Sequence, residues 1–119
     1  MPAKISILLP IFNGERYLEK SINSVLRQTL ENFELIIVDD GSNDSSADIA
    51  RKYCAKDKRL RFFEHQQNQG LFSTYNHCLE LAEGEYVKPF AQDDLLNEKA
   101  VEKMHAVLSE DDSIALVAC

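Results

Sequence analysis

Two pairs of adjacent aspartates are the side chains in this sequence best placed to do chemistry. Asp39 and Asp40 end the run FELIIVDD, and Asp93 and Asp94 end the run YVKPFAQDD. A carboxylate accepts hydrogen bonds, so Asp39 could select a base through N3–H of uracil or the N–H groups of guanine, but not through the bare ring nitrogens of adenine or cytosine. The second pair suits ribose hydroxyls or a hard divalent cation, which would also neutralise a diphosphate. For Asp39 and Asp40 the alternative is that they only start a turn and cap the next helix.

The stretches before these pairs predict buried strands. Leu35–Val38 is apolar without a break, which is typical of a central parallel strand buried on both faces. Parallel strands point their carboxyl ends toward one edge of the sheet, and ligands of open α/β sheets bind in the crevice outside that edge. The two acidic pairs are therefore expected to face one cleft, although they come from different strands.

Strands and helices alternate along the whole chain. The patterns predict strands over residues 4–9, 33–38, 60–64, 86–90 and 114–119, and helices over residues 15–28, 46–56, 71–82 and 97–109. Pro10 is expected to end the first strand, and Pro89 suggests a bulge or a break in pairing near the end of the fourth. His105 falls on the inner face of the last helix and is expected at the edge of the core. The fold class predicted is α/β, in three α/β/α layers around a mostly parallel central sheet with right-handed crossovers.

Length and charge limit the class of protein. With 119 residues, 45% of them hydrophobic, the chain is expected to form one globular domain with a real core. The 13 basic and 20 acidic residues give a formal charge of -7, and no cluster of Lys and Arg marks a phosphate-tracking surface, which argues against nucleic acid as a partner. An anionic ligand would have to be met by a metal ion, backbone N–H groups or a few placed cations, because the overall field repels it.

The cysteines and the apolar segments indicate a reducing, cytoplasmic setting. Cys54, Cys78 and Cys119 are odd in number and show no C-x-x-C spacing, which argues against a disulfide framework and a structural zinc site. The apolar stretch Ile5–Phe12 is too short to span a bilayer and lacks a signal-peptide pattern. Any contact with the inner face of a membrane would have to come from parts outside this sequence.

Two long blocks closely resemble the nucleotide-binding half of family 2 glycosyltransferases, which have the GT-A fold. They read LLPIFNGERYLEKSINSVLRQTLENFELIIVDDGSNDSSADIA and NQGLFSTYNHCLELAEGEYVKPFAQDD, and the resemblance runs from Ile5 to Leu96. It implies a Rossmann-like half-domain in which residues 1–119 form the N-terminal, donor-binding part. The implied reaction transfers a sugar from a nucleotide diphosphate sugar, a UDP-sugar in the first instance, to a glycan, a lipid-linked or another hydroxyl acceptor. Transfer would proceed with inversion and usually with Mg²⁺ or Mn²⁺.

The resemblance, carried over by position, also assigns roles to residues at the ends of the predicted strands. Asp39 would read the base, while Asp40 and Ser42 hold the turn. Asp93 and Asp94 match the last two acids of a D-x-D-D pattern, with Asp93 facing the metal. The matches that would wall the nucleotide are Pro10, Ile11 and Phe12. Those that shape the first turn are Asn13 and Glu15, and those in the loop and helix over the nucleotide are Asn68, Gly70 and Asn76.

Two positions depart from the family pattern. Tyr75 stands where an arginine is common, so a phosphate or base contact is expected to be lost. Ala91 stands where the first acid of D-x-D-D belongs. Because Mg²⁺ is often held by one or two protein carboxylates together with phosphates and waters, the metal site is expected to be weakened but not abolished.

The resemblance places the general base and the acceptor site beyond Cys119, so no catalytic residue is assigned within the chain. A positioned base is worth about 10²–10⁴-fold in rate, and we therefore expect little transferase activity from these residues alone. The last run, Ile114–Cys119, is strand-like and stops without a turn, as in a chain truncated at its C-terminus. Exposed apolar surface is expected there, with a homodimer as the candidate assembly.

Three other classes are compared with this interpretation. A nicotinamide-dependent dehydrogenase needs a G-x-G-x-x-G turn after its first strand, but PIFNGE has one glycine. In a phosphoacceptor receiver domain the acidic pair follows the first strand, whereas Asp39 and Asp40 follow the second. A non-catalytic module of the same fold, which binds a nucleotide sugar or serves as a scaffold, is favoured by Ala91 and by the missing C-terminal half.

Overall fold

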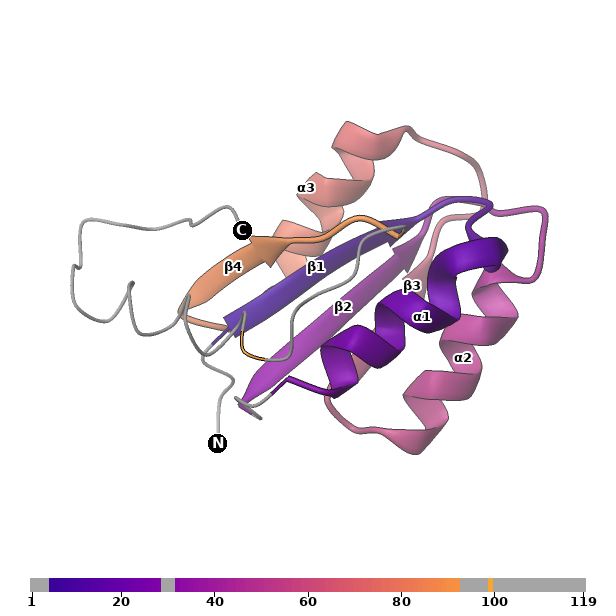
Figure 1. Ribbon diagram of the computed structural model, residues 1–119. Helices are drawn as coiled ribbons and strands as arrows, with labels where there is room; N and C mark the ends of the chain where they lie inside the picture. Colours follow the sequence, from indigo (N-terminus) through magenta and orange to yellow (C-terminus); the bar gives the residue numbers. More distant parts are fainter. Residues whose placement is uncertain (1–4, 29–31, 93–98, 100–119) are drawn as a thin grey trace.

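The computed structural model describes residues 5–28, 32–92 and 99, and its elements alternate between strand and helix (Figure 1). They are β1 (Ile5–Ile11), α1 (Glu15–Leu26), β2 (Phe33–Asp39), α2 (Ser46–Lys56), β3 (Leu60–Glu64), α3 (Leu71–Leu81) and β4 (Tyr86–Pro89). Within the described part of the chain, no helix combines the length and the apolar character needed to cross a membrane.

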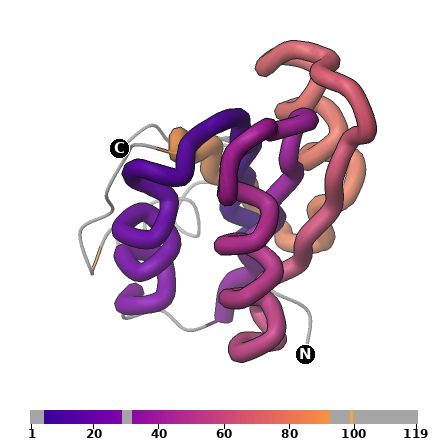
Figure 2. The backbone as a smooth tube through the Cα atoms, turned by 90° about the vertical axis from the view of Figure 1, so that its right-hand side faces the viewer, coloured from indigo at the N-terminus to yellow at the C-terminus, as the bar shows by residue number. Residues whose placement is uncertain are grey.

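The four strands form one sheet in the order β3-β2-β1-β4, and each neighbouring pair is parallel. Helices α1 and α2 cover one face of the sheet, and α3 covers the other (Figures 1 and 2). The α/β class and the three-layer arrangement predicted from the sequence are therefore confirmed. In this arrangement the last residues of β1 and β2 lie side by side, with Ile11 opposite Asp39.

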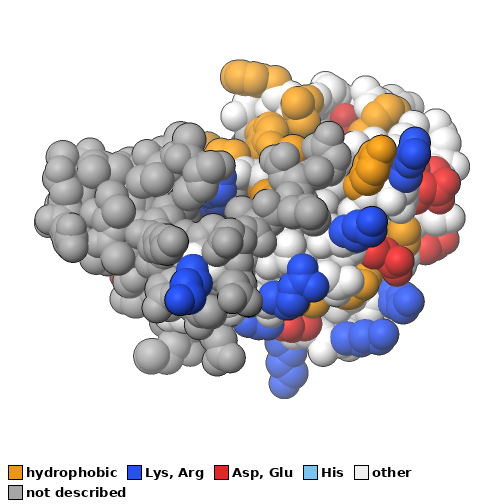
Figure 3. Space-filling view, in the orientation of Figure 1, with side chains coloured by type: hydrophobic (Ala, Val, Ile, Leu, Met, Phe, Trp, Pro, Cys, Tyr) orange, Lys and Arg blue, Asp and Glu red, His pale blue; other side chains and the backbone are white. Residues whose placement is uncertain are grey.

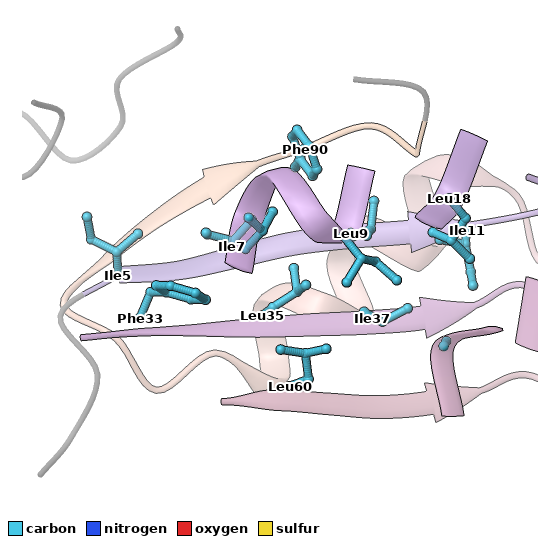
Figure 4. Close-up of a cluster of buried hydrophobic side chains, with 13 residues drawn as sticks. Ile5, Ile7, Leu9, Ile11, Leu18, Phe33, Leu35, Ile37, Leu60 and Phe90 are labelled. Atoms are coloured by element: carbon cyan, nitrogen blue, oxygen red, sulfur yellow. The ribbon is translucent and has the colours of Figure 1, made fainter. Parts of the chain in front are cut away.

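The core is built by the alternation of strand side chains between the two faces of the sheet. On the face under α1 and α2, the main cluster contains alternate residues of β1 and β2 together with helix side chains (Figure 4). On the face under α3, Leu8, Ile36 and Val38 pack with Cys78. Because β1 and β2 are buried on both faces, their sequences are almost continuously apolar.

The observed boundaries differ from the predicted ones mainly at Pro10. Strand β1 continues through Pro10 to Ile11, with Pro10 opposite Val38 of β2. The pairing of β1 with β4 ends earlier, at Leu8 opposite Pro89. A proline is tolerated in β1 because its nitrogen points to the side on which β4 no longer pairs. The predicted helix over residues 97–109, the strand over residues 114–119 and the placement of His105 lie outside the described residues.

Candidate nucleotide-binding site

A cavity of about 280 Å³ opens at the carboxyl edge of the sheet, on the side of α3. It is walled by the end of β1, the loop before α3, the first turns of α3 and the segment after β4; the lining residues are Pro10, Ile11, Phe12, Asp40, Asn68, Leu71, Thr74, Tyr75, Ala91 and Gln92. The structure thus brings together the three residues at the end of β1 and just after it that were predicted to wall the nucleotide, and one carboxylate of the first acidic pair. We call this space the β1–α3 cavity.

The rim of the β1–α3 cavity is apolar on its α3 side. Leu71 lines the cavity yet is 65% exposed, and its neighbour Phe72 is 83% exposed. Hydrophobic side chains are visible over α3 in the space-filling view (Figure 3). The lining therefore offers a flat aromatic ligand apolar surface from both α3 and Phe12.

Asp40 forms the polar end of this wall and holds the loop before α3. Its Oδ1 accepts the N–H of Gln69 at 2.8 Å, and its Oδ2 accepts the N–H of Gly70 at 2.9 Å. The side-chain amide of Asn68 donates to the backbone carbonyl of Asp40 at 3.2 Å. Burial alone would raise the pKa of Asp40, but it is outweighed by hydrogen bonds that hold the pKa below its ordinary value, from the side chain of His65, the N–H groups of Gln69 and Gly70, and the side chain of Thr74.

Asp39, which was predicted to read the base, lies at the same edge of the sheet, opposite Ile11, but beside a different cavity. It is absent from the lining of the β1–α3 cavity and lines a second, more polar cavity with the start of α2 and the end of β3, beside Ala47 and Glu64. Its Oδ2 accepts the N–H of Ser42 at 3.1 Å. Its Oδ1 is the one buried side-chain oxygen or nitrogen, among the described residues, that has no hydrogen-bond partner.

Asn13 and Glu15 tie the turn after β1 to the loop before α2. Asn13 Oδ1 accepts the N–H of Asn43 at 2.8 Å, and Glu15 Oε2 accepts the N–H of Ser45 at 3.0 Å. In return, the loop offers side-chain acceptors to the N–H groups of residues 13–15, namely Ser42 Oγ, Ser46 Oγ and Asp44 Oδ2. Asn13 has a φ of 48°, a left-handed conformation that asparagine tolerates better than most residues. Both side chains therefore shape the turn and do not line the β1–α3 cavity.

Two glycines allow the loops around Asp40 to approach each other. Gly41 has a φ of 76°, and a Cβ there would lie 2.9 Å from the backbone nitrogen of Asn68. Gly70 has a φ of 97° and directs its N–H to Asp40. Asn76, which was predicted to lie over the nucleotide, is exposed on α3 and does not line either cavity.

Two histidines extend the contacts of Asp40 toward α3, and the sequence reasoning missed them. His65 Nδ1 lies 2.9 Å from Asp40 Oδ1, and His65 Nε2 lies 2.8 Å from His77 Nδ1. In the tautomer with Nδ1 protonated, His65 donates to the carboxylate and its Nε2 accepts the Nδ1–H of His77. This series of contacts links the end of β2 to the middle of α3. No local pattern reveals it, because the residues come from three separate elements.

The positions that depart from the family pattern both line the β1–α3 cavity. Tyr75 donates its hydroxyl to the carbonyl of Phe90 at 3.0 Å, and Ala91 presents a methyl group where an acid was expected. Asp93 and Asp94 lie outside the described residues. Among the residues that are described, no group of three or more acidic, histidine or cysteine side chains is arranged to hold a metal ion.

The comparisons with known proteins agree on one family. The model of "Glycosyl transferase family 2" matches residues 6–119. The chain is 32% identical to the glycosyltransferase GlyG of Streptococcus pneumoniae over 98% of its own length and 39% of that protein. It is 37% identical to the putative glycosyltransferase EpsH of Bacillus subtilis, over 97% of its own length and 33% of that protein. The chain thus spans well under half the length of these relatives.

A solved structure gives the same answer for the fold. The chain is similar to S. aureus TarS 1-349 in complex with UDP-GlcNAc, with a TM-score of 0.84 and 32% identity over 90% of this chain and 31% of that one. The GT-A type of fold implied by the sequence is therefore confirmed. Since the family model covers nearly the whole sequence, the chain belongs to glycosyltransferase family 2.

Proposed function

We propose that this chain is the donor-binding part of a glycosyltransferase that transfers a sugar from a UDP-sugar to a hydroxyl acceptor with inversion. The observation that carries the proposal is the β1–α3 cavity, which lies at the carboxyl edge of a parallel sheet, where open α/β folds bind ligands. The likeness to TarS, whose solved complex contains UDP-GlcNAc, supports a uridine nucleotide. Because the chain spans well under half the length of its relatives, we also propose that the acceptor site and the general base lie outside residues 1–119, and that residues 1–119 alone have little transferase activity.

The nucleotide base lies in the β1–α3 cavity, against Phe12. Phe12 is 40% exposed, so its ring is free to stack on a base without first leaving a packed core. Asp40 lines the same wall, but its oxygens already accept the N–H groups of Gln69 and Gly70, whereas Asp39 lines the second cavity. The base-reading role that the resemblance gives to Asp39 stays a prediction, which is supported by the absence of a hydrogen-bond partner for Asp39 Oδ1 among the described residues.

We propose that a divalent cation binds the carboxylates that follow this wall in the sequence. Ala91 and Gln92 line the cavity and directly precede Asp93 and Asp94 in the sequence, and carboxylates are the ligands that Mg²⁺ and Mn²⁺ prefer. When bound, such an ion neutralises the charge of the donor diphosphate. We propose Asp93 as its main protein ligand and Asp94 as a second ligand. Because Ala91 supplies no third carboxylate, the donor phosphates would have to supply part of the ion's coordination.

Titration calorimetry with UDP, in the presence and absence of Mn²⁺, tests the proposal. We expect saturable binding that Mn²⁺ strengthens, and weaker binding of ADP and CDP. Stacking of a base on an aromatic ring is worth about 1–3 kcal/mol, so Phe12→Ala should raise Kd about five- to a hundredfold. The matched control is Tyr17→Ala, because Tyr17 is 46% exposed but does not line the cavity.

Three outcomes would contradict three different parts of the proposal: the donor site, its location and the metal site. Absence of UDP binding by the folded protein would contradict a donor site altogether. Binding that Phe12→Ala and Tyr17→Ala change equally would contradict the β1–α3 cavity as its location. Binding that is indifferent to Mn²⁺ would contradict the metal site at Asp93.

A second candidate function is a non-catalytic module that binds a nucleotide sugar or serves as a scaffold. It is favoured by Ala91, whose methyl group lines the cavity where the family pattern has an acid. A transfer assay on the whole protein, with Ala91→Asp as the variant that restores the acid, separates the two functions. A catalytic protein transfers sugar before the substitution, whereas a module that has lost catalysis transfers none with Ala91 in place.

A further inference from the structure

The side chain of Gln92 forms two hydrogen bonds with the backbone of Phe12, across 80 positions of the sequence. The N–H of Phe12 donates to Gln92 Oε1 at 2.9 Å, and Gln92 Nε2 donates to the carbonyl of Phe12 at 3.0 Å. The amide side chain therefore pairs with Phe12 as a neighbouring strand would, satisfying the donor and the acceptor of one residue at once.

The pairing of β1 with β4 explains why a side chain is needed there. Leu8 is the last β1 residue in register with β4, and its carbonyl accepts the N–H of Phe90 at 2.9 Å. Pro10 is the next β1 residue facing that side and has no N–H to continue the ladder. Its place as donor to the Phe90 carbonyl is taken by the hydroxyl of Tyr75. One step further, at Phe12, Gln92 takes both the donor and the acceptor role.

Gln92 is itself held in place from α1 and from the turn before it. Its backbone carbonyl accepts the hydroxyl of Ser21, a buried residue of α1, at 2.5 Å. A Cβ on Gly14 would overlap with Gln92 Oε1 and lie 2.5 Å from Gln92 Cδ. The glycine at position 14 thus leaves room for the amide group, and Ser21 fixes the backbone that carries it.

We propose that Gln92 is a positioning residue, which sets the place of Phe12 at the wall of the β1–α3 cavity and so sets affinity for the donor nucleotide. The inference rests on the proposed function, because it assigns a role in the site where the base is bound. Both residues line the cavity, and the hydrogen bonds connect a wall made by β1 to the segment that leads from β4 to Asp93. Gln92 acts through the backbone of Phe12 and needs no contact with the base.

The first test measures the hydrogen bonds without a ligand. In NMR hydrogen exchange, the Phe12 amide should be protected in the wild type and lose at least about tenfold of its protection in Gln92→Ala. The control is Gln67→Ala, in the exposed loop before α3, which should leave exchange at Phe12 unchanged. Equal protection of Phe12 in the wild type and in Gln92→Ala would overturn the proposed pairing.

The second test measures the effect on the site, by titration of UDP in the presence of Mn²⁺. Loss of two hydrogen bonds that hold the wall should raise Kd about five- to tenfold in Gln92→Ala. At neutral pH, Gln92→Glu should weaken binding by at least as much, since it places a carboxylate against the Phe12 carbonyl. Protonation restores a donor, so the ratio of the Gln92→Glu and wild-type Kd values should fall as the pH is lowered toward 5.

These measurements separate failure of the inference from failure of the proposed function. If the wild type binds UDP and both Gln92 variants bind it equally well, Gln92 does not position the site, and the proposed function stands. If the wild type does not bind UDP, the proposed function fails and the role of Gln92 in it fails as well. Should Gln92→Ala not fold, the pH-dependent ratio for Gln92→Glu decides, and a ratio that does not change with pH counts against the inference.

Discussion

Asp39 and Asp40 are adjacent in the chain, yet they line two different cavities. Side chains alternate between the two faces of the sheet along β2. Asp39, two positions after Ile37, lies on the side that α1 and α2 cover, whereas Asp40, two positions after Val38, lies on the side of α3. Their environments differ accordingly: Asp40 accepts several hydrogen bonds, whereas Oδ1 of Asp39 accepts none from the described residues. The first acidic pair of the sequence is therefore two separate sites, with separate consequences for mutation.

Substituting Asp40→Asn should lower the free energy of unfolding at neutral pH and make that free energy depend less on pH in the acid range. The change leaves at least one N–H of the loop without its acceptor, which should cost about 2–3 kcal/mol in the free energy of unfolding. The pKa of Asp40 lies below its ordinary value of 3.8, so its carboxylate stabilises the fold fully above that pH. This stabilisation is lost as the pH falls from 3.8 through the lower pKa of the folded state. Urea denaturation at pH 7 and at pH 3 measures both effects.

A control and a partner variant sharpen this test. Asp48→Asn removes a carboxylate whose side chain is 82% exposed and should change the unfolding free energy by less than about 0.5 kcal/mol. His65→Ala removes one hydrogen bond from Asp40 and should move the acid transition to higher pH. An acid transition that is identical in wild type and Asp40→Asn would contradict the assignment.

The local elements could be predicted from the sequence because each depends on nearby residues. The apolar run before Asp39, for example, identifies a buried strand wherever it is placed in the fold. The opposite directions of Asp39 and Asp40 were also within reach, since side chains alternate along a strand. The contact between Gln92 and Phe12 was not, because a side chain that pairs with a distant backbone leaves no periodic pattern. Gly14 leaves the space that the Gln92 amide occupies, but a glycine in a turn does not indicate which side chain it will meet.

The thiols of Cys54 and Cys78 should resist alkylation in the folded protein. Burial raises the pKa of Cys54 from 9.0 to about 11 and that of Cys78 from 9.0 to about 12. Since the thiolate is the reactive form, each should react at pH 8 at least about a hundredfold more slowly than in the unfolded chain. Peptide mapping after brief treatment with iodoacetamide, with and without urea, measures the two sites separately. Rapid labelling of Cys78 without urea would contradict its burial.

Gly14→Ala should destabilise the protein through Gln92. Gly14 has a φ of -108°, which alanine adopts freely, so the backbone is not strained by the change. The added methyl group meets the amide of Gln92, and overpacking of this kind costs about 1–3 kcal/mol. In a Gln92→Ala background the obstacle is gone, and the same change should cost less than about 0.5 kcal/mol. Additive unfolding free energies in the double variant would mean that the methyl group clashes with something else.

Tyr75→Phe should weaken the same wall from the other side. The tyrosine hydroxyl donates to the Phe90 carbonyl, which Pro10 cannot reach with an N–H of its own. Removing it should cost about 1 kcal/mol in the free energy of unfolding, measured by urea denaturation. Tyr17→Phe, on the exposed face of α1, is the matched control and should leave that free energy unchanged. A cost at Tyr17 equal to that at Tyr75 would show that the hydroxyl does not replace the missing proline donor.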